Sequence, residues 1–143
     1  MNQQEILDRV WNYFITQKNP QSMSTEADST TPICMYRTST GNRCAVGVLI
    51  PDESYHPGLE DLGAVDWIVT KIRERDRLQN PDPLPALEQL GEDMRALLLE
   101  HETFLTKIQT AHDTTPLEDE TFEDMLRERL TRIAHRFSLK VPQ

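Results

Sequence analysis

Two cysteines, Cys34 and Cys44, lie on either side of a polar turn and are separated by nine residues. Structural zinc sites combine two close pairs of Cys or His ligands, whereas this chain has one widely spaced pair. His56, His112 and Asp113 could complete a ligand set only if the fold brought them together. The spacing therefore predicts that neither cysteine binds a metal, and it favours two buried free thiols.

Other cysteine chemistry is less well supported by the sequence. A redox pair needs a Cys-x-x-Cys at a helix N-terminus, which is absent here. A nucleophilic thiol, Cys34 or Cys44, needs a histidine partner that the spacing does not specify, so a small Cys- or metal-dependent hydrolase stays an alternative. The chain has no Walker loop, GxGxxG, HExxH or GxSxG motif. The sequence therefore favours a non-enzymatic role, with no catalytic residue and no cofactor.

Three residues around the polar turn could instead contact a ligand. Tyr36 and Arg37 precede the turn and Arg43 follows it, which offers an aromatic ring and positive charge at the mouth of a pocket for a small anion. His112 and Asp113 form a second candidate pair at the end of a predicted helix. A hydrogen-bonded histidine at the edge of the core explains that pair equally well.

Two acidic stretches, residues 52–61 and 118–124, are the predicted contacts for a basic partner. The residues of the first stretch that we expect to bind are Asp52, Glu53, Tyr55, Glu60 and Asp61. The second stretch places five carboxylates in the first turns of a predicted helix, where the helix dipole also favours them. Residues 71–77 carry four basic side chains among acids and are the best local match to a phosphate contact.

The net charge of −9 argues against binding to the nucleic-acid backbone, because such binding depends on Lys and Arg neutralising phosphates. The N-terminus does not resemble a secretory signal, and no apolar run reaches the roughly 20 residues that span a bilayer. We therefore expect a cytoplasmic protein that does not bind membranes and keeps its thiols reduced. A length of 143 residues predicts one domain.

Apolar spacing predicts a mainly α-helical protein. The expected helices cover residues 2–17, 62–77, 86–112 with a possible interruption at Gly91, and 115–137. The first is expected to begin with a capping box formed by Asn2 and Glu5, and the last with one in residues 115–118. In the last helix Phe122, Leu126, Leu130 and Ile133 are expected to be buried. Residues 18–32 are predicted to form a long loop, either a lid or a connector. The prolines in residues 77–85 must interrupt the helical structure there.

Residues 33–37 and 43–50 flank a turn that contains Gly41, and this pattern predicts a β-hairpin whose second arm could instead be a short buried helix. Gly47, within the apolar second arm, suits a close approach between two backbones. The expected fold class is mainly α (α+β), with about four or five helices packed around one small β-hairpin.

The segment from residue 34 to residue 55 resembles the signature of an uncharacterised family of small phage and bacterial mobile-element proteins. The matching residues are Cys34, Tyr36, Arg37, Gly41, Cys44, Ala45, Gly47, Leu49, Ile50, Asp52, Glu53 and Tyr55. The N-terminal helix and residues 105–113 are also similar. The resemblance implies no activity and no catalytic residue that could be carried over.

This chain departs from the family pattern at three places. Thr38 stands where the pattern has Gly, and Val48 stands where it has a third Cys, which further lowers the case for a metal site. The segment 58–85 is longer than its counterpart in the family and could hold a specialised surface.

Three functions are consistent with these observations. The first is a non-catalytic phage or mobile-element protein that binds a host protein, plausibly a counter-defence inhibitor whose acidic surface complements a basic, nucleic-acid-binding partner. The second is a protein that sequesters a small anionic nucleotide through arginines. The third is the small hydrolase considered above.

Overall fold

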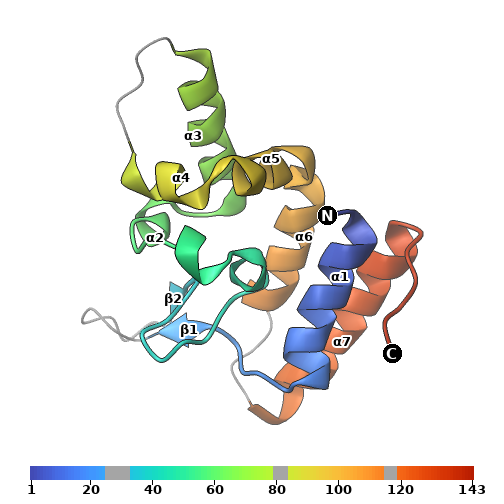
Figure 1. Ribbon diagram of the computed structural model, residues 1–143. Helices are drawn as coiled ribbons and strands as arrows, with labels where there is room; N and C mark the ends of the chain where they lie inside the picture. The colour runs from blue at the N-terminus through green and yellow to red at the C-terminus, as the bar shows by residue number, and fades with distance from the viewer. Residues whose placement is uncertain (25–32, 79–83, 115–118) are drawn as a thin grey trace. The chain divides into compact units, whose positions relative to one another are not determined.

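The computed structural model describes residues 1–24, 33–78, 84–114 and 119–143, and its described part is mainly α-helical, as expected (Figure 1). The chain forms two compact units, which are described separately. Unit 1 comprises residues 1–49 and 107–143, and unit 2 comprises residues 50–106. Among the described residues, no helix is long and apolar enough to cross a membrane. The domain count expected from the length stays a prediction.

Unit 1 begins with helix α1, Gln3–Trp11, which continues as a π-helical segment, Asn12–Thr16. The predicted capping box is present: Asn2 Oδ1 accepts a hydrogen bond from the Glu5 backbone at 2.9 Å, and the Glu5 carboxylate accepts one from the Asn2 backbone. The helix buries one apolar face made of Ile6, Leu7, Val10 and Trp11, followed by Phe14 and Ile15.

Helix α7, Asp119–Arg136, packs against α1 (Figure 1). Phe122, Leu126 and Leu130 are buried, which confirms most of the predicted stripe. Ile133 is only half-buried, and Ala134 takes its place in the core. The predicted capping residues at 115–118 lie outside the described residues.

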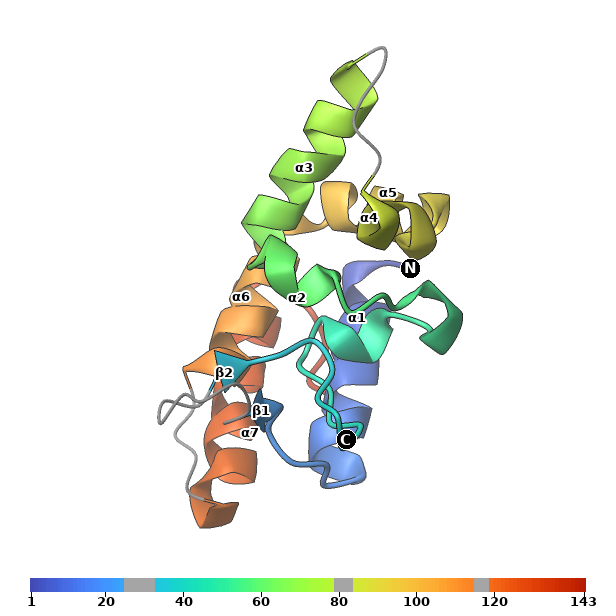
Figure 2. The same cartoon turned by 90° about the vertical axis from the view of Figure 1, so that its left-hand side faces the viewer.

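Of the two structures left open for the second arm of the predicted β-hairpin, the protein has the short buried helix and not the strand. Strand β1, Met23–Ser24, pairs antiparallel with β2, Ile33–Cys34 (Figure 2). The turn around Gly41 adds a single backbone bridge between Arg37 and Arg43. Residues 44–50 instead form a turn and a 3₁₀-helix, Gly47–Leu49. An unbroken apolar run is compatible with a buried strand or a buried helical turn, and periodicity cannot separate them.

The expected close approach at Gly47 is confirmed. A Cβ atom at this position would lie 2.0 Å from the carbonyl oxygen of Tyr36, so a larger residue cannot fit without moving the backbone. The Cys44 sulfur accepts the Gly47 N–H at 3.3 Å, and Cys44 is itself buried. Cys44 therefore has a structural role at the start of this helical turn.

Unit 2 is built from short helices. They are a 3₁₀-helix Asp52–Ser54, α2 Leu59–Leu62, α3 Val65–Arg77, α4 Pro85–Leu90, α5 Glu92–Glu100 and the first residues of α6, Glu102–Asp113. Helix α3 packs against α5 through its apolar face, which carries Val65, Ile68, Val69 and Ile72.

The helix expected over residues 86–112 is divided into three, α4, α5 and α6, and the interruption considered at Gly91 is one of the two breaks. With the short α2, which was not expected, the described part has seven α-helices. Gly91 has a φ of +87°, a conformation that interrupts a helix and that glycine adopts readily. A second break falls at His101, whose φ and ψ are −112° and 24°. No glycine or proline stands at residue 101, so the sequence holds no local signal for this break.

We predict that Leu130→Ala lowers the free energy of unfolding by about 2–5 kcal/mol, because it removes most of a fully buried side chain and leaves a cavity in the core. Urea denaturation followed by circular dichroism measures this change. The matched control is His135→Ala on the exposed side of the same helix, where we expect less than about 0.5 kcal/mol. Equal losses in the two variants would show that Leu130 is not a core residue.

Candidate functional site

The structure divides the predicted site residues between the two units. Unit 1 contains Tyr36, Arg37, Arg43, His112 and Asp113, and unit 2 contains Asp52, Glu53, Tyr55, Glu60 and Asp61. Each set is therefore considered within its own unit.

His112 lies at the centre of a buried hydrogen-bond network in unit 1. Its side chain is fully buried, and its Nε2 atom accepts the backbone N–H of Ser22 at 3.0 Å. Because a backbone N–H can only donate, the proton of the neutral ring must be on Nδ1. Nδ1 therefore donates to Asp113 Oδ1, which lies 2.8 Å away.

Gln109 extends this network by one turn of α6. Its amide nitrogen donates to Asp113 Oδ1 at 2.6 Å, and its amide oxygen accepts the backbone N–H of Val46 at 2.9 Å. Gln21 donates to the His112 carbonyl oxygen at 2.7 Å. The end of α6 thus holds two separate loops of unit 1 in place.

Cys34 lies next to this network. In the part of the chain that the structure describes, Cys34, His112 and Asp113 form the group of possible metal ligands, with ligand atoms within 4.8 Å of one another. Burial, then the charge of Asp113 and a hydrogen bond to it, raises the pKa of the Cys34 thiol to about 12. The thiol is therefore protonated at neutral pH, which makes it a poor nucleophile.

The hydrogen bonds of His112 also oppose metal binding. A metal on Nδ1 would displace the bond to Asp113 and place the ring proton on Nε2, facing the N–H donor of Ser22. A metal on Nε2 would displace Ser22 itself. The arrangement suits a structural network better than a metal centre or a Cys–His nucleophile.

The residues predicted around the turn lie in or beside the core of unit 1. Tyr36 is buried, and its carbonyl oxygen lies against Gly47. Arg37 and Arg43 are half-buried and face each other across the backbone bridge. None of the three lines the pocket described next.

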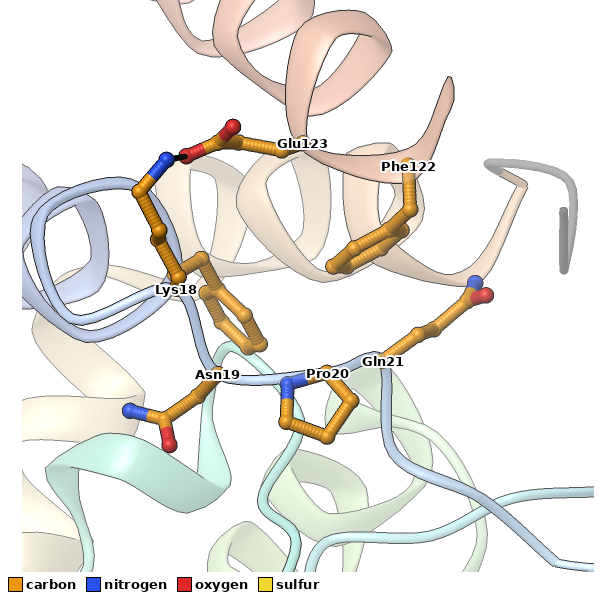
Figure 3. A pocket seen from close by; sticks show the side chains of 7 residues that line it. Lys18, Asn19, Pro20, Gln21, Phe122 and Glu123 are labelled. Atoms are coloured by element: carbon orange, nitrogen blue, oxygen red, sulfur yellow. Dashed lines mark hydrogen bonds and ion pairs between the residues drawn. The ribbon is translucent and has the colours of Figure 1, made fainter. Parts of the chain in front are cut away.

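A pocket of about 350 Å³ lies beside the buried network, between the end of the π-helical segment and the start of α7 (Figure 3). Its lining residues are Phe14, Lys18, Asn19, Pro20, Gln21, Phe122 and Glu123. The sequence analysis missed this site, because it assigned Phe122 to the core and Lys18 to a loop. Segments about 100 residues apart form it, and no local motif signals such a pairing.

In unit 2 the acidic stretch 52–61 is partly used within the protein. The Tyr55 hydroxyl donates to Glu60 at 2.7 Å, so neither group is fully available to a partner. Asp52, Glu53 and Asp61 have exposed side chains. His56 Nδ1 accepts the Gly58 backbone N–H and belongs to a turn.

Trp67 on α3 is a surface feature that the sequence analysis did not single out. Its side chain is 61% exposed, whereas the apolar residues around it in the sequence are buried. A signal was available, because the helical spacing of Val65, Ile68, Val69 and Ile72 leaves position 67 on the outer face.

We predict that protein purified without added metal contains no stoichiometric zinc, because the Cys34 thiol is protonated and both His112 nitrogens are engaged. Elemental analysis of wild type and of Cys34→Ser measures this. About one zinc per chain in the wild type, lost in the variant, would contradict the assignment.

Substitution of Asp113 tests the network directly. Asp113→Ala removes the acceptor of Gln109 and His112, and we expect a loss of about 1–3 kcal/mol in the free energy of unfolding. Asp113→Asn keeps one acceptor oxygen in the same place and is the matched control, with a smaller loss expected. If the Asp113→Asn and Asp113→Ala variants lose the same free energy of unfolding, the loss does not come from the missing acceptor oxygen.

Comparison with protein-family models, curated proteins and solved structures finds no match to this chain. The resemblance of residues 34–55 to phage and mobile-element proteins therefore stays an expectation. What the protein does has to be argued from its own side chains.

Proposed function

We propose that the protein acts by binding another protein, and that the exposed face of α3 around Trp67 is the contact surface. The exposure of Trp67 is the observation that carries the proposal. Tryptophan is enriched among the residues that dominate the energy of protein interfaces, because it buries a large rigid surface on binding.

The same face of α3 carries a second exposed apolar residue. Leu78, directly after the helix, is 51% exposed and lies eleven residues from Trp67, which is close to three full helical turns. Between them lie Lys71 and Glu74, which form an ion pair at 3.6 Å. The α3 face therefore offers a partner two exposed apolar side chains, separated by an ion pair that is already satisfied within the helix.

The charge at the start of the α3 face, before the basic residues 71–77, favours a basic partner. Asp61 and Asp66 both precede Trp67 in the sequence, on either side of Gly63, and both have exposed side chains. A Cβ atom at Gly63 would lie 3.6 Å from the Trp67 ring, so the indole packs beside the connection between α2 and α3. Exposed carboxylates next to an exposed indole complement a positively charged surface that includes an apolar recess.

The expected partner is a host protein with a basic, nucleic-acid-binding surface. This assignment rests on the resemblance to phage and mobile-element proteins together with the acidic charge, and it makes inhibition of a host defence protein the expected role. Trp67, Leu78 and both carboxylates lie in segment 58–85, the part that is longer than in the family pattern.

We predict that Trp67→Ala reduces retention of the partner from host-cell lysate by at least about tenfold, because central interface tryptophans contribute about 2 kcal/mol or more. The double variant Asp61→Lys, Asp66→Lys should slow association, and high salt should have the same effect on wild type. Immobilised protein and surface plasmon resonance with the retained partner measure both effects.

The matched charge control is Asp93→Lys on α5, the helix that packs against the buried face of α3. We expect it to bind normally, and all variants to keep the melting temperature of the wild type. Partner retention that is unchanged by Trp67→Ala and by the Asp61, Asp66 variant would refute the proposal. So would a partner whose association does not depend on salt.

A further inference from the structure

The outer side of α3 carries a stripe of side chains whose order suits pairing with a second α3 helix that runs in the opposite direction. Along the helix the stripe has an apolar residue, a cation, an anion and a second apolar residue. They are Trp67, Lys71, Glu74 and Leu78, and all are exposed or partly exposed. Because each residue of a helix turns by about 100°, their spacing keeps the stripe within about 60° of arc. Read backwards, the order is apolar, anion, cation, apolar, which complements the forward order.

Two further charges stand at the ends of the helix, beside this stripe. Asp66 and Arg77 are eleven residues apart, which is close to three full turns, so both lie on the same side of the helix. Both side chains are exposed, and in the described part of the chain neither has an ion-pair partner. The arginines between them, Arg73 and Arg75, are already paired inside the protein. The outer side of α3 therefore offers a negative charge at its start and a positive charge at its end.

Copies of one chain usually associate about a two-fold axis, which requires the contact surface to complement itself. Antiparallel pairing of two α3 helices, with the axis near residue 72, sets every residue of the stripe and both end charges opposite a complementary side chain. The contacts between the copies are then Trp67 with Leu78, Lys71 with Glu74 and Asp66 with Arg77, each made twice. Parallel pairing would set each charge against its own copy, so the charges favour the antiparallel arrangement.

We propose that α3 pairs antiparallel with α3 of a second copy of this chain and forms a weak dimer. Exposed ion pairs are weak, so Lys71 and Glu74 can change partners across the axis at little cost. One helix face per copy buries less than the roughly 1,200 Å² of a standard stable interface, so we expect a dissociation constant of about 10–500 µM.

Self-association goes beyond the binding of a host protein and does not depend on it. Because the dimer covers Trp67, a second copy and a host protein would compete for the α3 face. The test therefore uses the full chain alone, so a failure of the host-protein proposal leaves its result unchanged.

Sedimentation velocity of the full chain at increasing concentration measures the dimer. Two chains of net charge −9 repel each other at long range, so the buffer contains about 0.15 M salt, where the screening length is about 8 Å. We expect a shift from monomer to dimer between about 5 and about 500 µM. Trp67→Ala removes an apolar contact on both sides of the axis and should weaken the dimer at least about tenfold.

Charge reversal tests which residues face each other. Asp66→Arg sets an arginine against Arg77 of the second copy twice, and Arg77→Asp sets two aspartates together in the same way. Each variant alone should therefore dimerise at least about tenfold more weakly than wild type. An equimolar mixture of the two variants should recover the dimer, because the arginines of one copy then meet the aspartates of the other. The double variant Asp66→Arg, Arg77→Asp should recover it by itself.

Mixing does not repair a defect within one helix, so recovery separates contact between copies from an effect on the helix ends. Asp93→Arg on α5 makes the same charge change at an exposed position outside α3 and should dimerise as wild type. Circular dichroism checks that each variant is folded. If a reversal does not fold, Asp66→Asn tests the same contact with little change in size, and we expect it to weaken the dimer about threefold.

Three results would overturn the proposal. One is a chain that stays monomeric up to about 500 µM, which is the weakest affinity expected for this interface. A second is a dimer that Trp67→Ala leaves unchanged, since the copies would then meet through another surface. The third is a mixture of folded Asp66→Arg and Arg77→Asp variants that associates no better than either variant alone.

Discussion

The hydrogen bond from the Ser22 backbone to His112 Nε2 fixes much of unit 1. It places the ring proton on Nδ1, which directs that proton to Asp113, and the same carboxylate oxygen accepts the Gln109 amide. Gln109 is then oriented so that its oxygen meets the Val46 N–H. One tautomer thus connects segments that lie more than 60 residues apart in the chain. Because this network is buried, each unmade bond would cost more than a surface bond.

The same network determines the ionisation and the reactivity of the Cys34 thiol. A thiolate next to an imidazolium would form if the ring could take up the thiol proton, but its acceptor nitrogen is already used by Ser22. Burial and then the charge of Asp113 raise the pKa of the Cys34 thiol to about 12. A cysteine, a histidine and an aspartate lie within 4.8 Å of one another, and yet the hydrogen-bond directions oppose both nucleophilic and metal chemistry. For the chemical role of this cluster, residue types and proximity are therefore weaker evidence than the direction in which each hydrogen-bond donor points.

Patterns that act over a few residues predicted the fold well. The Asn2 capping box, the α7 stripe through Leu130 and the close contact at Gly47 follow from local spacing or from the size of a side chain. The sequence left residues 44–50 open between a strand and a short buried helix, because an apolar run has the same composition in both, and the structure has the helical turn. The site was harder to predict, since Ser22 meets His112 and Lys18 meets Glu123 only in three dimensions. No sequence period relates residues that are 90 or more positions apart.

The net charge of −9 does not by itself say where a partner would bind. Several carboxylates are already engaged inside the protein: Glu60 accepts from Tyr55, Glu88 pairs with Arg75, and Asp113 accepts from two side chains. Each of these has lost part of its ability to attract an external cation. Asp61 and Asp66 are exposed and lie near an exposed indole in the sequence, so their charge adds to an apolar contact. Electrostatic attraction alone is screened by salt, whereas a buried indole is not. A surface that combines the two can therefore both steer a basic protein and retain it.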